Sequence, residues 1–410
     1  MSEQLTRFDG WLKEDGPAAL VLREFLMPVE GDDGVIFPPT FAAGDGFKGG
    51  YNIDEFPDGS NVCVLDTFGS QANRIEPLFA TEDFRNLIPQ IVIEAGEKRV
   101  NLLEAGHRAG DAIVRCTELQ QKLHAAFKAL LMGDALLLAK LAPTSLVFGV
   151  WDSRDTQAKA PRLIASTIRA FNVRRLTRSA QYVPAVDYVQ EKLLEEPGDL
   201  KTEEGRIKTK HPFAQRGFTH VPATGTHGGV IAAGGIRRDA TLHLAALRML
   251  RAKNGADATL NLQRYLLGLA LIALAYQPSS YLRQGCNLVR KPETSRETKL
   301  VYLDGRRESV DIGLDEAKQF ASDAADTFVV ERPEKETFKF DPEKAKTDLA
   351  ESFSIEFFVD AYRMKNPSGH PRRCGYSRRS WPEVHWHCLI GLKSGLARSS
   401  IWRALIGLPF

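Results

Sequence analysis

The sequence has few of the features that would define its class at once. Its 410 residues contain only five cysteines, an odd number at wide spacing, which does not fit a disulfide-stapled secreted domain. No apolar run reaches the roughly 20 residues that cross a bilayer. The longest, Tyr265–Tyr276, is expected to be a buried helix. The N-terminus lacks a signal-peptide pattern. We therefore expect a cytoplasmic protein with no membrane partner.

Motifs for catalysis and cofactor binding are lacking as well. The sequence has no GxxxxGK[ST] loop, no GxGxxG followed by a ribose-binding acid, and no HExxH or Ser-His-Asp arrangement. Residue types that bind zinc occur near the C-terminus at spacings that fit no common zinc pattern: His370, Cys374, His385, His387 and Cys388. The sequence therefore predicts no catalytic residue, no metal and no cofactor.

The charges are present in ordinary number but are unevenly distributed. Hydrophobic residues make up 43% and charged residues 26%, as in a soluble globular protein, and the net charge is only +2. Between Ala160 and Val186 there is no acid, whereas the stretch 187–204 is acidic. Five arginines fall in the acid-free stretch: Arg162, Arg169, Arg174, Arg175 and Arg178. A polyanionic partner is one interpretation of this pattern.

Hydrophobic periodicity predicts a mixture of strands and helices. Strands are expected at 35–39, 61–65, 145–151, 217–221 and 229–233, and in the alternating sequence after Arg290. Helices are expected after Ser70, over 111–141 with a break at Gly133, and over 162–170, 239–253 and 257–276.

The arginines of the acid-free stretch form the first candidate site. If residues 162–170 are helical, Arg162 and Arg169 share one face, and the other three arginines cluster beyond the helix end. Gln181 and Tyr182 nearby can hydrogen-bond to or stack on bases, as single-stranded nucleic-acid binding requires. The alternative is a solvated basic helix face.

The second candidate is the stretch GTHGGVIAAGGIRRDAT, residues 225–241. Its glycines permit positive φ and close approach of another backbone. Arg237 and Arg238 are expected to begin a turn or helix that favours anions. The stretch predicts either a phosphate site, with His227 beside it, or a β-hairpin with a glycine turn. Polar residues elsewhere that could contact phosphate or sugar are Asn73, Arg74 and Arg108.

Five segments taken together resemble a known family. They are DTFGSQANRIEP, GHRAGDAIVR, LVFGVWDSR with APRLIASTIRAFNV, RSAQYVPAVDY and GGIRRDATLHLAALR, in this order. The chain resembles the Cas-seven backbone subunit of type I-G (formerly I-U) CRISPR Cascade, a member of the RAMP superfamily. The resemblance runs from about Phe37 to Leu288, and residues 366–410 do not share it.

The resemblance implies an α+β fold. An RRM-like (ferredoxin-like) antiparallel sheet forms a palm backed by helices, with long finger and thumb insertions. It implies that residues 1–290 are the palm with its insertions. Residues 291–365 would be a charged C-terminal part of the palm or a small subdomain, and residues 366–410 a basic Trp-rich tail.

The resemblance also implies a non-catalytic subunit that polymerises head to tail along a CRISPR guide RNA. The guide then pairs with target DNA while other Cascade subunits complete the complex. The implied RNA contacts are Asn73, Arg74, Arg108, Arg162, Arg169, Arg174, Arg175, Arg178, Gln181, His227, Arg237 and Arg238. Residues 219–233 are the implied thumb or RNA-facing loop.

Two further functions stay open from the residues alone. One is a nucleotide-binding, metal-dependent enzyme that uses the glycine-rich turn at 225–235, with Asp152 or Asp239 near the metal. The other is a DNA- or RNA-binding protein unrelated to CRISPR, which the charge pattern also permits.

Overall fold

The structure is a computed structural model that describes residues 3–292, 294, 296–328 and 336–350. The chain divides into two compact units, residues 1–346 and 347–410, and the account below concerns the first. The predicted tail at 366–410 and its zinc-type residues lie outside the described residues.

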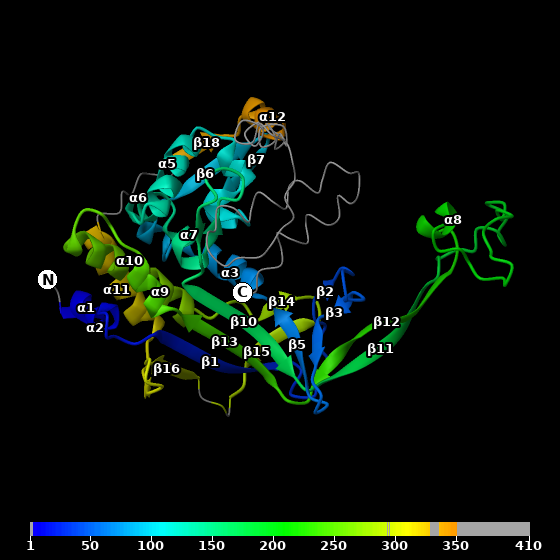
Figure 1. Cartoon of the computed structure of the whole chain (residues 1–410). Coiled ribbons are helices and arrows are strands. Elements are labelled where there is room, and N and C mark those ends of the chain that lie inside the picture. The colour runs from blue at the N-terminus through cyan, green and yellow to red at the C-terminus, as the bar shows by residue number, and fades with distance from the viewer. Residues whose placement is uncertain (1–2, 293, 295, 329–335, 351–410) are drawn as a thin grey trace, which may run out of the picture. The chain divides into compact units, whose positions relative to one another are not determined.

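An antiparallel sheet of nine strands organises the described part of this unit (Figure 1). Seven strands follow the order β14-β15-β1-β13-β10-β5-β4, and β16 and β17 join through β1. Their bounds are β1 Ala19–Pro28, β4 Ile53–Glu55, β5 Asn61–Asp66, β10 Ile164–Phe171, β13 Ile236–Leu242, β14 Tyr281–Arg283, β15 Cys286–Arg290, β16 Glu297–Val301 and β17 Arg307–Ser309. The predicted α+β class is confirmed, as are the strand at 61–65 and the strands after Arg290.

Helices pack on one face of this sheet. Their bounds are α1 Glu3–Thr6, α2 Asp9–Leu12, α3 Phe68–Ile75, α4 Ala112–Arg115, α5 Leu119–Leu131, α6 Leu136–Leu141, α7 Pro143–Phe148, α9 Leu244–Met249, α10 Ala256–Ala275, α11 Leu314–Phe328 and α12 Pro342–Ala350. The larger apolar core joins the helices to alternate residues of the strands, including Leu20, Leu22 and Leu242. The helix break expected at Gly133 is confirmed, and its φ of +80° is one that glycine adopts without strain.

The smaller sheets and the arm complete the fold. A three-stranded sheet joins β6 Ile91–Ala95, β7 Lys98–Asn101 and β18 Glu336–Lys339; short pairs are β2 Thr40–Phe41 with β3 Gly50–Tyr51, and β8 Val150–Trp151 with β9 Lys159–Ala160. Strands β11 Val173–Tyr182 and β12 Val221–Ala232 form the long antiparallel pair that Figure 1 shows leaving the central sheet. We call these two strands, with the connecting residues 183–220, the arm.

The prediction of a helix at 162–170 was wrong, because residues 164–171 form strand β10. The two apolar residues Ile164 and Ile168 are four apart, a spacing that fits both a helix and one face of a strand. These residues form a strand because they pair with β13 on one side and with β5 on the other.

The strand expected at 145–151 was also wrong over most of its length. Pro143 begins helix α7, a position that suits proline because its missing N–H has no helical partner there. Gly149, with a φ of +84°, ends the helix, and only Val150 and Trp151 are extended.

Three other boundaries differ from expectation. Residues 35–39 form no named strand and contribute one bridge, between Ile36 and Val230. The two short strands expected at 217–221 and 229–233 are replaced by the single strand β12, which begins at Val221. Asp239 lies inside β13, so the helix expected at 239–253 is shortened to α9.

Helix α10 is the apolar centre of the helical layer. It is long and apolar enough to cross a membrane, yet most of it is buried in the protein, which is consistent with a soluble protein and with the buried helix that the sequence predicted. Gly268 allows α11 to approach closely, since a Cβ at this position would lie 2.7 Å from the Cα of Ala321.

We predict that Gly268→Leu destabilises the fold by about 1–3 kcal/mol or more, because the added side chain must push α11 away. Gly10→Leu is the control, since a Cβ at Gly10 meets nothing within 4 Å. Thermal unfolding of the two variants checks this. Equal melting temperatures would contradict the close packing of α10 on α11.

Candidate nucleic-acid interface

The arm carries an excess of positive charge. Arg174, Arg175 and Arg178 are exposed on β11, and neither β11 nor β12 contains an aspartate or glutamate. Glu55, outside the arm, lies 3.5 Å from Arg175, in an ion pair whose side chains are both more than half exposed. An exposed ion pair of this kind contributes little to the stability of the protein. The arm therefore presents three exposed guanidinium groups on a strand that contains no acid.

An aromatic ring lies beside one of these arginines, and Gln181 lies further along the same strand. The guanidinium carbon of Arg178 lies 5.8 Å from the ring centre of Phe37, within the range of a cation–π contact. The main chain of Gln181 pairs with Pro222 across the arm; the side chain of Gln181 is outside what the structure describes. Arginine beside aromatic surface is typical of single-stranded nucleic-acid binding sites.

The arm is bent away from the sheet at a defined point. Asn172, between β10 and β11, has a φ of +49°, and Gly235, between β12 and β13, has a φ of +81°. Asn61 of β5 fixes the bend, because its side chain accepts a hydrogen bond from Val173 N (2.7 Å) and donates one to Val173 O (3.1 Å). The bend is thus built into the strands that continue from the central sheet.

The glycines of the 225–241 stretch serve the protein's own packing. A Cβ on Gly228 would lie 2.7 Å from the backbone of Thr177, and one on Gly229 would lie 2.9 Å from Ile36 O. The N–H of Gly229 donates to the hydroxyl of Tyr51 (3.0 Å). The exposed His227 lies edge-on to the ring of Tyr51, with centroids 4.7 Å apart. The close approach expected at these glycines is therefore to backbone and not to a phosphate.

The face of the central sheet that the described helices leave free, which we call the uncovered face, carries a second group of cations. Arg169 of β10 lies opposite Arg237 of β13, which lies opposite Phe25 of β1. The guanidinium of Arg237 stacks over Phe171 at 4.6 Å, and its Nε lies 2.9 Å from Asp239. Arginines and phenylalanines thus share this face, because they occupy the strand positions that alternate with the buried ones.

Arg238 points the other way, into the core. Both arginines belong to strand β13, so the turn or helix that was expected to begin at Arg237 and Arg238 is not formed. Arg238 is 2% exposed. Its Nε donates to the hydroxyl of Ser166 (3.1 Å), and its Nη1 lies 3.6 Å from the carboxylate of Glu24. Burial lowers the pKa of Arg238 to about 10.

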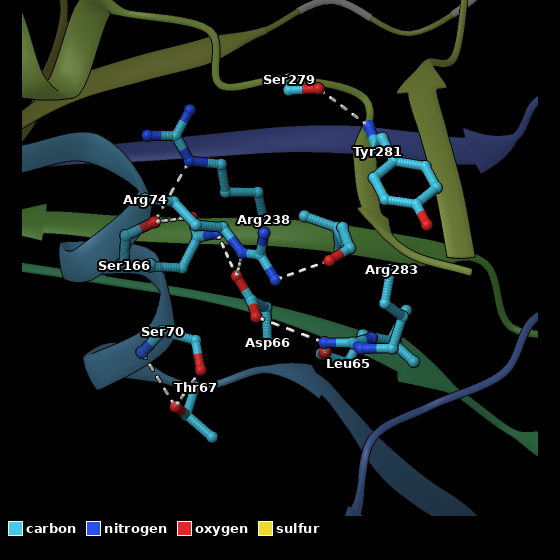
Figure 2. Close-up of polar contacts among 12 residues, drawn as sticks. Leu65, Asp66, Thr67, Ser70, Arg74, Ser166, Arg238, Ser279, Tyr281 and Arg283 are labelled. Carbon is cyan, nitrogen blue, oxygen red and sulfur yellow. Dashed lines mark hydrogen bonds and ion pairs between the residues drawn. The ribbon is translucent and has the colours of Figure 1, made fainter. Parts of the chain in front are cut away.

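Arg74 belongs to the same buried polar network (Figure 2). The Ser166 hydroxyl donates to Gln71 (2.9 Å), whose amide donates to the buried Asp66 (2.6 Å). Arg74 donates to the same Asp66 oxygen (3.1 Å) and to the carbonyl of Leu282 (2.7 Å). We call the row Glu24, Arg238, Ser166, Gln71 and Asp66 the polar belt. It crosses four strands and reaches helix α3.

Arg108 is buried in a separate ion pair. Its Nε lies 2.5 Å from Glu76, and its other nitrogens donate to Gly149 O (3.2 Å) and to Asn73 (3.4 Å). Burial raises the pKa of Glu76 to about 7, against the opposing effect of Arg108, so the carboxylate is charged above neutral pH. Asn73 is exposed at this point, and Arg162 is exposed over Gly149.

The structure thus divides the predicted residues into two groups. Arg108 and Arg238 are fully buried and occupied by protein partners, and Arg74 is half-buried and occupied likewise. The exposed or half-exposed group is Asn73, Arg162, Arg169, Arg174, Arg175, Arg178, His227 and Arg237. The sequence reasoning missed Arg23 and Phe25, which the alternation of LVLREFL in β1 places on the uncovered face.

Comparison with protein-family models matches part of the chain. Residues 20–175 match the family model described as CRISPR-associated protein GSU0053 (Cas_GSU0053). The resemblance to a CRISPR-associated family is thereby confirmed for this stretch. The stretch runs from the start of β1 to Arg175 and so includes the first residues of the arm. No curated protein matches the chain.

We predict that Glu76→Ala destabilises the fold by about 3–5 kcal/mol at pH 8, because it leaves the charge of Arg108 buried without its partner. Glu343→Ala is the control, since Glu343 pairs with Lys346 on the surface, where both side chains are more than two-thirds exposed. Chemical denaturation of both variants measures the difference. If Glu76→Ala lowered the free energy of unfolding no more than the control does, burial of Arg108 would not require the ion pair with Glu76.

Proposed function

We propose that this protein is a non-catalytic CRISPR RNA-binding backbone subunit of a type I-G Cascade complex that acts in antiviral defence. The observation that carries the proposal is the arm: a long projecting strand pair with three exposed arginines and no acid in either strand. The family match over residues 20–175 supports the CRISPR context.

The strand order supports an RRM-like palm. From β16 or β15 at one side, the order through β1, β13 and β10 is fourth, first, third and second along the chain, all antiparallel. Helices connect β1 to β10 and β13 to β15. This is the connectivity of a β-α-β-β-α-β unit. On this proposal the arm is the thumb, inserted between the second and third strands.

The proposed RNA surface runs from the arm to the neighbouring part of the palm. The arm arginines are its centre, and Arg169, Arg237 and Arg162 extend it along the palm, with Asn73, Arg74, Gln181 and His227 as further contacts. Arg108 and Arg238 are left out of this surface, because both are buried in the core, beside Glu76 and Glu24 respectively. Phosphate contacts of this kind hold a strand without reading its sequence.

The remaining features of the proposal follow from the family. Copies of the chain associate head to tail along the guide in the cytoplasm, other Cascade subunits bind the ends, and target DNA is bound through the guide. We keep residues 1–290 as the palm with its insertions. Because β16 pairs with β1, we assign the strands after residue 290, β16 and β17, to the palm as well.

The alternative, a metal-dependent enzyme with a nucleotide at 225–235, has less support. The backbone of the protein fills the space beside Gly228 and Gly229. Within the described ranges, no group of three or more His, Cys, Asp or Glu side chains is arranged to hold a metal ion.

We predict that the triple variant Arg174→Ala, Arg175→Ala, Arg178→Ala loses most of the RNA that co-purifies with the wild type when a CRISPR array is co-expressed. The residual affinity should also respond less to salt, by about 2 in the slope of log affinity against log salt, since each contact to a single strand contributes roughly 0.7. Ultraviolet absorbance, denaturing gels and binding titrations at several salt concentrations measure both effects.

The control is a second triple variant in the same arm, Lys201→Ala, Arg206→Ala, Lys208→Ala. Two of these cations already pair with acids of the tip, Glu196 and Glu204. It should retain RNA. If both variants retained RNA equally, the arm arginines would not bind RNA and would only form a solvated surface.

A further inference from the structure

Three arginines lie near one glutamate at the point where strand β1, inside the central sheet, changes its partner from β16 to β15. Strand β1 pairs with β16 up to Arg23 and with β15 from Leu26, so Glu24 lies at the junction. Arg238 lies directly opposite Glu24 in β13, and Arg290 lies opposite Leu26 in β15. Arg296 lies just before β16, and it donates to Leu274 O at the end of α10, where Arg238 donates to Tyr276 O (3.3 Å).

The arginines of this group contact Glu24, the Ser166 hydroxyl and the main-chain carbonyls at the end of α10. The Nε of Arg290 lies 2.6 Å from Glu24 Oε1, an ion pair without hydrogen-bond geometry, and the Nη1 of Arg238 lies 3.6 Å from Glu24 Oε2. Arg296 donates to Leu274 O at 3.1 Å, at the C-terminal end of α10. We call Glu24, Arg238, Arg290 and Arg296 the arginine cluster.

The positive charge of the arginine cluster exceeds what surrounds it. Three guanidinium groups face one carboxylate, and the C-terminus of α10 adds about half a negative charge at most. Asp311 acts on Arg296 but is itself exposed, so water screens it. The positive charge of the three arginines therefore exceeds the negative charge of Glu24, which is buried together with Arg238 at no more than 3% exposure.

Two donors of the arginine cluster have no acceptor. Among the described residues, the buried Nη2 of Arg238 and the buried Nε of Arg296 make no hydrogen bond. A buried donor without an acceptor is costly, and a buried excess charge is more so. An anion with several acceptor oxygens would satisfy both deficits at once, and planar guanidinium groups bind phosphate oxygens in pairs.

We propose that the arginine cluster is a phosphate-binding site, distinct from the RNA surface of the arm. The side chain of Arg290 is 41% exposed and forms the outer end of the site, while Arg238 forms its buried end. The phosphate is either inorganic phosphate or one phosphodiester of a bound nucleic acid. Both present the same oxygens to the arginines.

The test is thermal unfolding of the RNA-free protein with added inorganic phosphate, compared with sodium chloride at equal ionic strength. Phosphate binding to the folded state raises the melting temperature with concentration. We expect this rise in the wild type and its loss in Arg290→Ala and Arg296→Gln. Glu24→Gln should start from a lower melting temperature and show a larger rise, because it removes the competing carboxylate.

Arg7→Ala is the control, since Arg7 is an exposed arginine that pairs with Glu316 elsewhere in the fold and should leave the response intact. Should Arg296→Gln fail to fold, calorimetric titration of Arg290→Ala with phosphate decides, because the Arg290 side chain is the most exposed of the three. The absence of a phosphate-specific rise in the wild type would overturn the proposal. So would an unchanged rise in Arg290→Ala and Arg296→Gln.

The source of the phosphate follows from repeating the titration with RNA-loaded protein. Loss of the response there identifies a phosphodiester of the RNA as the occupant, and persistence identifies free phosphate. The arm variant Arg174→Ala, Arg175→Ala, Arg178→Ala should keep the response of the RNA-free protein. Failure of the proposed RNA function and failure of this site are therefore observed separately.

Discussion

The polar belt is the constraint on which the rest of the structure depends. Glu24, Arg238, Ser166, Gln71 and Asp66 are all buried, and each needs its neighbour, because an unpaired polar group in the core is costly. The belt lies between two apolar clusters, one with Leu22 and Leu242 and the other with Leu26 and Ile236. A shift of any strand by one residue would move its belt residue to the other face of the sheet. The belt therefore specifies the register from β1 to β5 and holds α3 against β10.

That register also determines where the arm leaves the sheet. Strands β10 and β13 pair through the belt, and the same two strands continue past Asn172 and Gly235 into β11 and β12. Because Asn61 belongs to β5, the bend is held from the sheet itself. The arginines of the arm thus project from a base that Asn61 of β5 fastens to the central sheet.

Two kinds of arginine result, and sequence alone did not separate them. Arg237 and Arg238 are adjacent, yet one lies over Phe171 on the uncovered face and the other is buried against Glu24. The acid-free stretch correctly indicated exposed cations at Arg174, Arg175 and Arg178, because the residues around them in the sequence include no acid. The burial of Arg108 could not be predicted from the neighbouring sequence, since its partner Glu76 is 32 residues away along the chain.

The sequence by itself determined the α+β class, the strand at 61–65, the long apolar helix and the resemblance to a CRISPR-associated family. These features depend on local periodicity, composition and residue order. Only the tertiary structure decided that residues 164–171 are a strand, since a spacing of four between Ile164 and Ile168 satisfies both periods until β13 and β5 supply hydrogen bonds. It also decided which arginines face solvent, because burial depends on partners far away in the chain, and local sequence does not specify them.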